Sequence, residues 1–367
     1  MQLVDLGWSD DLAYSFSTYA AAGYQVGRVA VVHRSQYHLY TKQGECTATL
    51  TGKFRHQAQA SEAFPVVGDW VVIQSPISPQ QASPAQAAST PPTQLALIEA
   101  LLPRKSQIVR QAAGSRTEAQ AIAANIDTIF LMSGLDHDFN LRRIERYLVM
   151  AWDSGSNPVI LLNKADMCED VADKLAAVEA IAMGVSIITL SALYQDNLTA
   201  LDPYLQRGKA IALLGSSGVG KSTLTNQLMG QAIQATQAVR LDDSRGRHTT
   251  TTRSMVQLPS GALLIDTPGM RELQLWRTSD SLEDTFADVE GLIQDCRFRN
   301  CSHQAEPGCA IQRGLEIGEL STQRWANYQK LQKEQAYLER RQDQQAQHNT
   351  KARWKAISKQ IRKNRKA

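Results

Sequence analysis

Lys209-Ala-Ile-Ala-Leu-Leu-Gly-Ser-Ser-Gly-Val-Gly-Lys-Ser222 is the stretch that decides the fold of this chain. Its apolar run, 209–214, predicts a buried parallel strand, and Ser222–Met229 predicts the opening of a helix. The glycine-rich turn between them fits the pattern G-x-x-x-x-G-K-[ST], in which backbone N–H groups cradle phosphates. A strand, this turn and a helix in succession predict a phosphate-binding loop rather than a Gly/Ser turn with a chance lysine.

The roles within this loop follow from the chemistry of phosphate. Lys221 is expected to reach the β and γ oxygens and to stabilise charge in catalysis, and Ser222 is expected to bind Mg²⁺. The predicted nucleotide contacts of the loop are Gly215, Ser216, Ser217, Gly218, Val219, Gly220, Lys221, Ser222 and Thr223.

A guanine-recognition pattern, N-K-x-D, is present as Asn163-Lys164-Ala165-Asp166 after the apolar run Pro158–Leu162. Ligands of open α/β sheets bind at the carboxyl ends of strands, which supports this interpretation. Asp166 can accept hydrogen bonds from guanine N1–H and its 2-amino group, whereas adenine would leave the carboxylate unpaired. Asp166 therefore predicts GTP and GDP as ligands and argues against an ATP-dependent nucleic-acid enzyme. Ser191 and Ala192, after the run 185–190, resemble the companion loop that contacts the base.

A third nucleotide motif, Asp266-Thr-Pro-Gly269, follows the apolar run 262–265. In D-x-P-G the aspartate holds a Mg²⁺-bound water, and the glycine N–H meets the γ-phosphate. Met270 follows, where Ras-type enzymes have a glutamine that orients the attacking water. Methionine cannot orient this water, so either another group places it or hydrolysis waits for a partner.

The segment 246–252 lies where the first switch is expected. His248 is its candidate for orienting water, with a plain surface histidine as the alternative. Thr250 is the favoured Mg²⁺ ligand in its run of threonines.

The order of these motifs is reversed, because the guanine motif precedes the phosphate loop. This order predicts a circularly permuted GTPase domain. Permutation can preserve the site, because the contacts emerge from one edge of a parallel sheet. It places both switches late in the domain, so the second switch can transmit the γ-phosphate state to the part of the chain that follows.

Three of the five cysteines cluster with a histidine in the spacing C-x4-C-x-H-x5-C. Such a Cys₃His set is typical of a tetrahedral structural zinc site with no open position for catalysis. A redox pair or a group of buried thiols is the alternative. The predicted ligands are Cys296, Cys301, His303 and Cys309.

The N-terminal part predicts a small β-barrel of the OB type. The barrel offers a basic face for RNA, although an OB-fold can equally be a scaffold. The expected strands are 24–33, 36–40, 45–50, 52–55 and 68–73, with a strand resuming at 97–102. The proposed basic face consists of Arg28, Lys42, Lys53, Arg55 and His56.

The C-terminal part predicts a helix with an apolar face, followed by a basic tail. Trp325, Tyr328, Leu331 and Leu338 share that face, which favours packing on the adjacent zinc domain. Residues 351–367 contain eight basic and no acidic residues. We expect RNA contact through counterion release, with a solvated tail as the alternative.

This set of motifs resembles the family of ribosome small-subunit-dependent GTPase A, the RsgA/YjeQ type, over about residues 20–330. The segments Pro65–Asp69 and Leu102–Ser106 also resemble barrel segments of that family. The resemblance implies an OB-fold, a permuted GTPase domain and a zinc domain. It also implies GTP hydrolysis stimulated by the 30S subunit, and a role in late maturation of that subunit. The alternative is a GTP-gated RNA-binding module, such as an RNA chaperone, in which hydrolysis is incidental.

The length of 367 residues and the net charge of +3 suit a multidomain enzyme. The chain has no run of eighteen apolar residues and no signal-peptide pattern, so we expect a cytoplasmic protein without membrane contact. The resemblance implies that it binds 16S rRNA, and we expect a monomer. The expected division is 1–20 as an N-terminal extension, 21–108 as the barrel with 75–93 as a disordered insertion, 109–275 as the GTPase domain, 276–345 as the zinc-binding domain and 346–367 as the basic tail.

Overall fold

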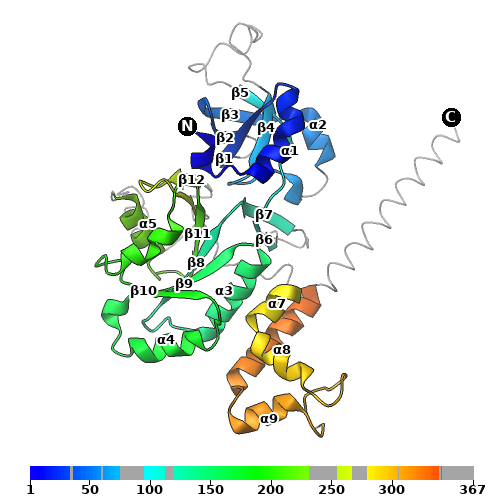
Figure 1. Cartoon of the computed structure of the whole chain (residues 1–367), viewed down its shortest axis with the longest axis vertical. Helices are drawn as coiled ribbons and strands as arrows, with labels where there is room; N and C mark the ends of the chain where they lie inside the picture. The colour runs from blue at the N-terminus through cyan, green and yellow to red at the C-terminus, as the bar shows by residue number, and fades with distance from the viewer. Residues whose placement is uncertain are drawn as a thin grey trace, which may run out of the picture. The chain divides into compact units, whose positions relative to one another are not determined.

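The chain forms two compact units in a computed structural model (Figure 1). Unit 1 consists of Met1–Val109 and Gln120–Leu273, and unit 2 of Arg110–Ala119 and Gln274–Ala367. The structure describes residues 1–33, 36–58, 61–74, 95–111, 119–230, 254–266, 279–304, 306–338 and 340. No helix in these described ranges has the length and apolar character needed to cross a membrane.

The N-terminal part of unit 1 is a closed barrel of five strands. The strands follow the order β1-β2-β3-β5-β4, and β4 pairs back with β1. Within the barrel, β3 and β5 are parallel neighbours, and the other four pairs of strands are antiparallel. Side chains such as Val29, Leu39 and Ile98 fill the interior, which confirms the predicted OB-type barrel. Its strands are β1 (Gln25–His33), β2 (Gln36–Thr41), β3 (Gly44–Leu50), β4 (Trp70–Gln74) and β5 (Leu95–Leu101).

The prediction of a strand at 52–55 is wrong, because this segment is the helix α2 (Gly52–Gln57). The Thr51 hydroxyl accepts a hydrogen bond from Phe54 N at 3.2 Å and caps the helix. The Phe54 side chain then packs into the barrel core. The fifth strand is β5, and the predicted insertion 75–93 lies outside the described residues.

Arg28 does not belong to an exposed basic face, which corrects a second expectation. Its side chain is buried and donates to three backbone carbonyls: Leu6 O, Gly68 O at 3.2 Å and Asn125 O at 2.9 Å. Burial lowers the pKa of the guanidinium to about 10, although Asp127 and Asp69 act in the opposite direction. Arg28 therefore joins the N-terminal segment, the barrel and the start of the next sheet.

The rest of unit 1 is an α/β domain whose five central strands are parallel, in the order β10-β9-β8-β11-β13. The edge strand β12 runs antiparallel to β13 and also pairs with β1 of the barrel, through Val31 and Ser254. The strands are β8 (Thr128–Gly134), β9 (Asn157–Asn163), β10 (Ser186–Thr189), β11 (Ala210–Gly215), β12 (Ser254–Gln257) and β13 (Leu263–Asp266).

Both faces of this sheet are buried, which explains the apolar runs in the sequence. Alternate residues of β8 serve the two faces. Ile129 and Leu131 pack in one cluster with α3 (Leu141–Asp153) and α4 (Val171–Glu179). Phe130 and Met132 pack in the other cluster with α5 (Lys221–Met229) and the short helix η6 (Leu198–Tyr204). The carboxyl ends of the strands are left to present loops.

Smaller elements complete unit 1, and two of them, β6 and β7, extend into the segment Arg110–Ala119 that is assigned to unit 2. The 3₁₀ turns η1 and η2 and the helix α1 flank the barrel, η5 follows β9, and β6 pairs with β7 as a two-stranded sheet. Their bounds are η1 (Leu3–Leu6), α1 (Asp10–Ala21), η2 (Ser61–Ala63), β6 (Gln107–Gln111), β7 (Ala119–Ala124) and η5 (Ala165–Met167).

Apart from residues 110, 111 and 119, which belong to β6 and β7, the secondary structure of the described part of unit 2 is helical. It contains α7 (Ser279–Thr285), α8 (Ala287–Gln294), α9 (Ala310–Ile317) and a helix over 322–338. The predicted apolar face of this last helix is confirmed, because Tyr328, Leu331 and Leu338 are buried and Trp325 stacks on Tyr328 with ring centroids 5.6 Å apart. The basic tail 351–367 lies outside the described residues.

Candidate nucleotide site and metal centre

The predicted phosphate loop connects β11 to α5, in the strand–turn–helix context that the motif requires. Gly218 and Gly220 have φ angles of 75° and 107°, which L-residues with side chains rarely adopt. A Cβ atom on Gly220 would also lie 2.2 Å from Asn163 Nδ2. Glycine at 220 therefore serves both the turn and its approach to the guanine motif.

Lys221 lies in the first turn of α5 with its ammonium group over the loop. Its Nζ donates to Gly215 O at 2.7 Å and to Ser216 O at 2.5 Å. Ser222 and Thr223 are half-buried in the same turn. A helix N-terminus with a lysine over a glycine-rich loop is a strong site for phosphate.

Asn163 ends β9 and ties three loops together. Its buried side-chain amide donates from Nδ2 to Val219 O of the phosphate loop at 2.7 Å. Its Oδ1 accepts from Ala192 N at 2.9 Å. The sequence places the guanine motif, the companion loop and the phosphate loop far apart, and this one side chain joins them.

The base-recognition groups surround Asn163. Lys164 has a φ of 66°, uncommon for a residue with a side chain, and Ala165 begins the short turn η5. Asp166 is exposed in that turn, and within the described parts of the chain we observe no hydrogen bond to its carboxylate. Ser191 is buried beside Ala192. A carboxylate presented in this way can accept from a guanine edge.

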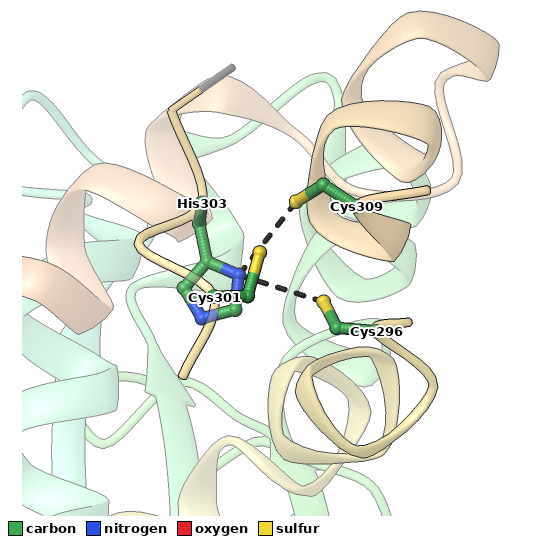
Figure 2. A group of neighbouring side chains, drawn as sticks. All are labelled: Cys296, Cys301, His303 and Cys309. Carbon is green, nitrogen blue, oxygen red and sulfur yellow. Dashed lines mark hydrogen bonds between the residues drawn. The ribbon is translucent and has the colours of Figure 1, made fainter. Parts of the chain in front are cut away.

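The predicted metal ligands converge in unit 2. Figure 2 shows Cys296, Cys301 and Cys309 around the ring of His303. Nδ1 of His303 lies 3.6 Å from Cys296 Sγ and 3.7 Å from Cys309 Sγ, and all four ligand atoms are within 4.8 Å of one another. A tetrahedral ion with metal–sulfur bonds of about 2.3 Å has ligands about 3.8 Å apart, so the cluster fits one metal ion.

Neighbouring groups shift the thiols of this cluster in different directions, because burial raises the pKa of Cys301 to about 11 whereas the pKa of Cys296 is lowered. Burial opposes ionisation of Cys296, but N–H groups of Ala310 and Ile311 donate to the sulfur, and the pKa of the thiol falls below its ordinary value. Gln312 Nε2 donates to His303 O at 2.6 Å and fixes the loop that carries the imidazole. Thiolate and a fixed imidazole are the forms that bind metal.

Sequence comparisons decide the family. The sequence model of the RsgA GTPase family matches residues 101–276. The small ribosomal subunit biogenesis GTPase RsgA of Opitutus terrae is 44% identical over 358 residues, covering 97% of this chain and 96% of that protein. RsgA 2 of Lactiplantibacillus plantarum is 47% identical over 326 residues, covering 88% of each chain. The chain belongs to the RsgA GTPase family. It is therefore a GTP-hydrolysing enzyme.

Solved structures agree on the fold. YjeQ from Thermotoga maritima matches with a TM-score of 0.59 and 26% identity, covering 84% of this chain and 97% of that one. YloQ, described as a circularly permuted GTPase, matches with a TM-score of 0.56 at 22% identity, covering 86% of this chain and 96% of that one. The match to this fold confirms the circularly permuted order that the motifs predict.

Some predicted site residues fall outside the described ranges. His248, Thr250 and Gly269 are among them, as is Met270. Asp266 ends β13, the parallel neighbour of β11, so its backbone lies at the same sheet edge as the phosphate loop.

Two further side chains at this edge were not identified from the sequence. Asp136 and Asp138 follow β8 directly and contact Lys164 and Ser216. A signal was present, because β8 is a buried strand whose carboxyl end must lie between those of β9 and β11.

Proposed function

We propose that this chain hydrolyses GTP on the small ribosomal subunit and acts in the late maturation of that subunit. The observation that carries the proposal is the Asn163 side chain, which joins the guanine motif to the phosphate loop and to Ala192. The relatives that share most of the chain's length are named small ribosomal subunit biogenesis GTPases.

The proposed nucleotide site uses Asp166 for guanine and the loop 215–223 for phosphates. Hydroxyl and carboxylate oxygens suit Mg²⁺, so Ser222, Thr250 and, through water, Asp266 are its proposed partners. Bound Mg²⁺ would supply positive charge against the β- and γ-phosphates. Lys221 and the loop N–H groups position the phosphates and stabilise the charge that develops during transfer.

For the metal centre we propose Zn²⁺ in a structural role. Three sulfurs and one imidazole nitrogen form the donor set that zinc prefers, and they leave no open coordination position. The cluster lies in a unit with short helices, where a metal ion contributes to folding.

The barrel offers a route by which RNA can act on the switches. Strand β12 follows the predicted first switch directly and pairs with β1 of the barrel through Ser254. Tyr40 of β2 also donates from its hydroxyl to Met255 O at 3.4 Å. We propose that 16S rRNA bound by the barrel and the basic tail orders the first switch through this pairing.

The deciding experiment measures GTP turnover with 30S subunits, with 50S subunits and alone. We expect slow intrinsic turnover and a rise of at least about a hundredfold with 30S only, since activators of other GTPases give roughly 10³–10⁵. His248→Ala should remove most of the stimulated rate and leave GTP binding almost intact. Equal turnover in all three conditions would favour the GTP-gated RNA-binding module over the ribosome-stimulated enzyme.

The remaining assignments complete this proposal. We place the protein in the cytoplasm as a monomer, because its proposed partner is assembled there. We keep the domain division at 1–20, 21–108, 109–275, 276–345 and 346–367.

A further inference from the structure

The loop between β8 and α3, residues 135–140, lies against both motif loops of the proposed nucleotide site. It is anchored at its two ends. Leu135 N donates to Asn163 O at 2.8 Å, and Asn140 caps α3 by accepting from Arg143 N at 3.1 Å. A segment fixed at both ends can impose a position on the side chains that it contacts.

Asp136 holds the lysine of the guanine motif. Its side chain is only 10% exposed, and Oδ2 accepts from Lys164 Nζ at 2.7 Å. Its other oxygen accepts from Asp138 N at 3.1 Å, which locks the carboxylate within the loop. Burial alone would raise the pKa of Asp136, but the hydrogen bond from Lys164 and that from Asp138 N bring it below its ordinary value. Asp136 is thus a charged partner for Lys164, whose backbone is in the left-handed region.

Asp138 holds the phosphate loop. Its Oδ2 accepts from the Ser216 hydroxyl. Arg143 donates from Nη1 to both oxygens at 2.7 Å. A lone carboxylate beside a phosphate loop would repel the nucleotide, and Arg143 neutralises this charge at short range. The loop can therefore place an acceptor at Ser216 without the electrostatic cost of an unpaired anion.

We propose that Asp136 and Asp138 are positioning residues of the nucleotide site, the first for Lys164 on the guanine side and the second for Ser216 in the phosphate loop. The inference rests on the proposed GTP site and extends it to a loop outside the recognised motifs. One loop thereby sets the spacing between the base end and the phosphate end of the site.

The two residues should affect different parts of the ligand. Asp136→Ala releases Lys164, so the affinities for GMP, GDP and GTP should all fall by about tenfold. Asp138→Ala releases the phosphate loop, so the affinities for GDP and GTP should fall by about tenfold while that for GMP changes little. Asp138→Asn keeps an acceptor for Ser216 and should restore most of the binding. His137→Ala is the matched control, since this neighbour's side chain is 95% exposed and its Nδ1 lies 3.9 Å from Asp136 Oδ2, beyond hydrogen-bond distance.

The test is competition against a fluorescent GDP, with folding of every variant checked by circular dichroism. Double-mutant cycles pair Asp136→Ala with Lys164→Met and Asp138→Ala with Ser216→Ala. Acting through these partners requires effects that are non-additive within each pair and additive across pairs. If the wild type binds nucleotide but both aspartate variants bind like His137→Ala, or if each pair is additive, the positioning roles are wrong. A wild type that binds no GTP would instead overturn the proposed function.

Discussion

The nucleotide site and the metal centre of this chain are held in shape by different means. At the nucleotide site, the loops after the parallel strands β9, β10 and β11 are joined by hydrogen bonds of 2.7–2.9 Å through the Asn163 side chain, above a sheet buried on both faces. At the metal centre, four ligands within fourteen residues lie between α8 and α9, each of eight residues. Helices this short are unstable on their own. The protein therefore builds the first site before its ligand arrives, whereas the second site depends on its ligand to be built.

The largest effect should come from removing the metal. Cys301→Ala, or a strong chelator, should unfold the segment from α8 to α9, since structural zinc contributes about 10–16 kcal/mol in zinc-finger peptides. GDP binding in unit 1 should largely survive. Metal analysis should find about one ion per chain in the wild type and almost none in the variant.

Cys46→Ala is the control for this experiment, because Cys46 is buried in the barrel core, outside the cluster. Its metal content should equal that of the wild type. A metal-free protein that keeps the helical signal and protease resistance of unit 2 would contradict the comparison.

The second effect is on base specificity. Asp166→Asn should reduce the preference for GTP over xanthosine triphosphate by at least about a thousandfold, because xanthine offers an acceptor where guanine offers a donor. Affinities for both nucleotides, measured by competition on wild type and variant, give this ratio directly. Unchanged GTP affinity in Asp166→Asn would show that the Asp166 carboxylate does not contact the base.

These two predictions rest on residues that the sequence alone identifies, and the reason is local. Guanine recognition and metal binding need particular residue types at short spacing, as in 163–166 and 296–309, so the sequence alone shows the pattern. The buried strands β8, β9 and β11 are likewise visible as apolar runs, because both faces of the sheet are covered.

What the sequence did not predict depends on contacts between distant residues. Arg28 looks like an exposed base in a strand, but its partners Leu6 and Asn125 lie far away along the chain. The segment at 52–55 forms a helix because Thr51 caps it and the barrel accepts Phe54. The role of Asp138 depends on Ser216, 78 residues further on.

The third effect tests whether the nucleotide site is truly prebuilt. Asn163→Ala leaves Val219 O and Ala192 N without their partner in a buried place, so affinities for GTP and GDP should fall by about ten- to a hundredfold. Asn157→Ala is the matched control, because Asn157 is exposed at the opposite end of the same strand. Isothermal titration with GDP measures both variants. If Asn163→Ala binds like Asn157→Ala, the loops hold their positions without this amide.

The smallest effect is a loss of stability in acid. Unit 1 and the metal centre should differ in the pH at which each loses stability. Asp127 Oδ1 lies 2.6 Å from Lys105 Nζ, and its Oδ2 accepts from Ala210 N at 2.8 Å. Burial opposes ionisation, but the hydrogen bonds from Ala210 and Lys105 outweigh it, and the pKa of Asp127 is lowered. A carboxyl group whose pKa is lowered in the folded state stabilises that state above its unfolded pKa of about 3.9, and this contribution is lost as the pH falls through the folded value. The wild type should therefore exceed Asp127→Asn in unfolding free energy by about 0.5–1 kcal/mol at pH 6, and the difference should vanish near pH 3.

The metal centre should lose its ion at a higher pH than this, because protonated thiols release the ion. Urea unfolding of both proteins between pH 3 and 6, with metal release followed in parallel, measures the two losses. A difference that persists at pH 3 would mean that the Asp127 carboxylate contributes nothing through its charge.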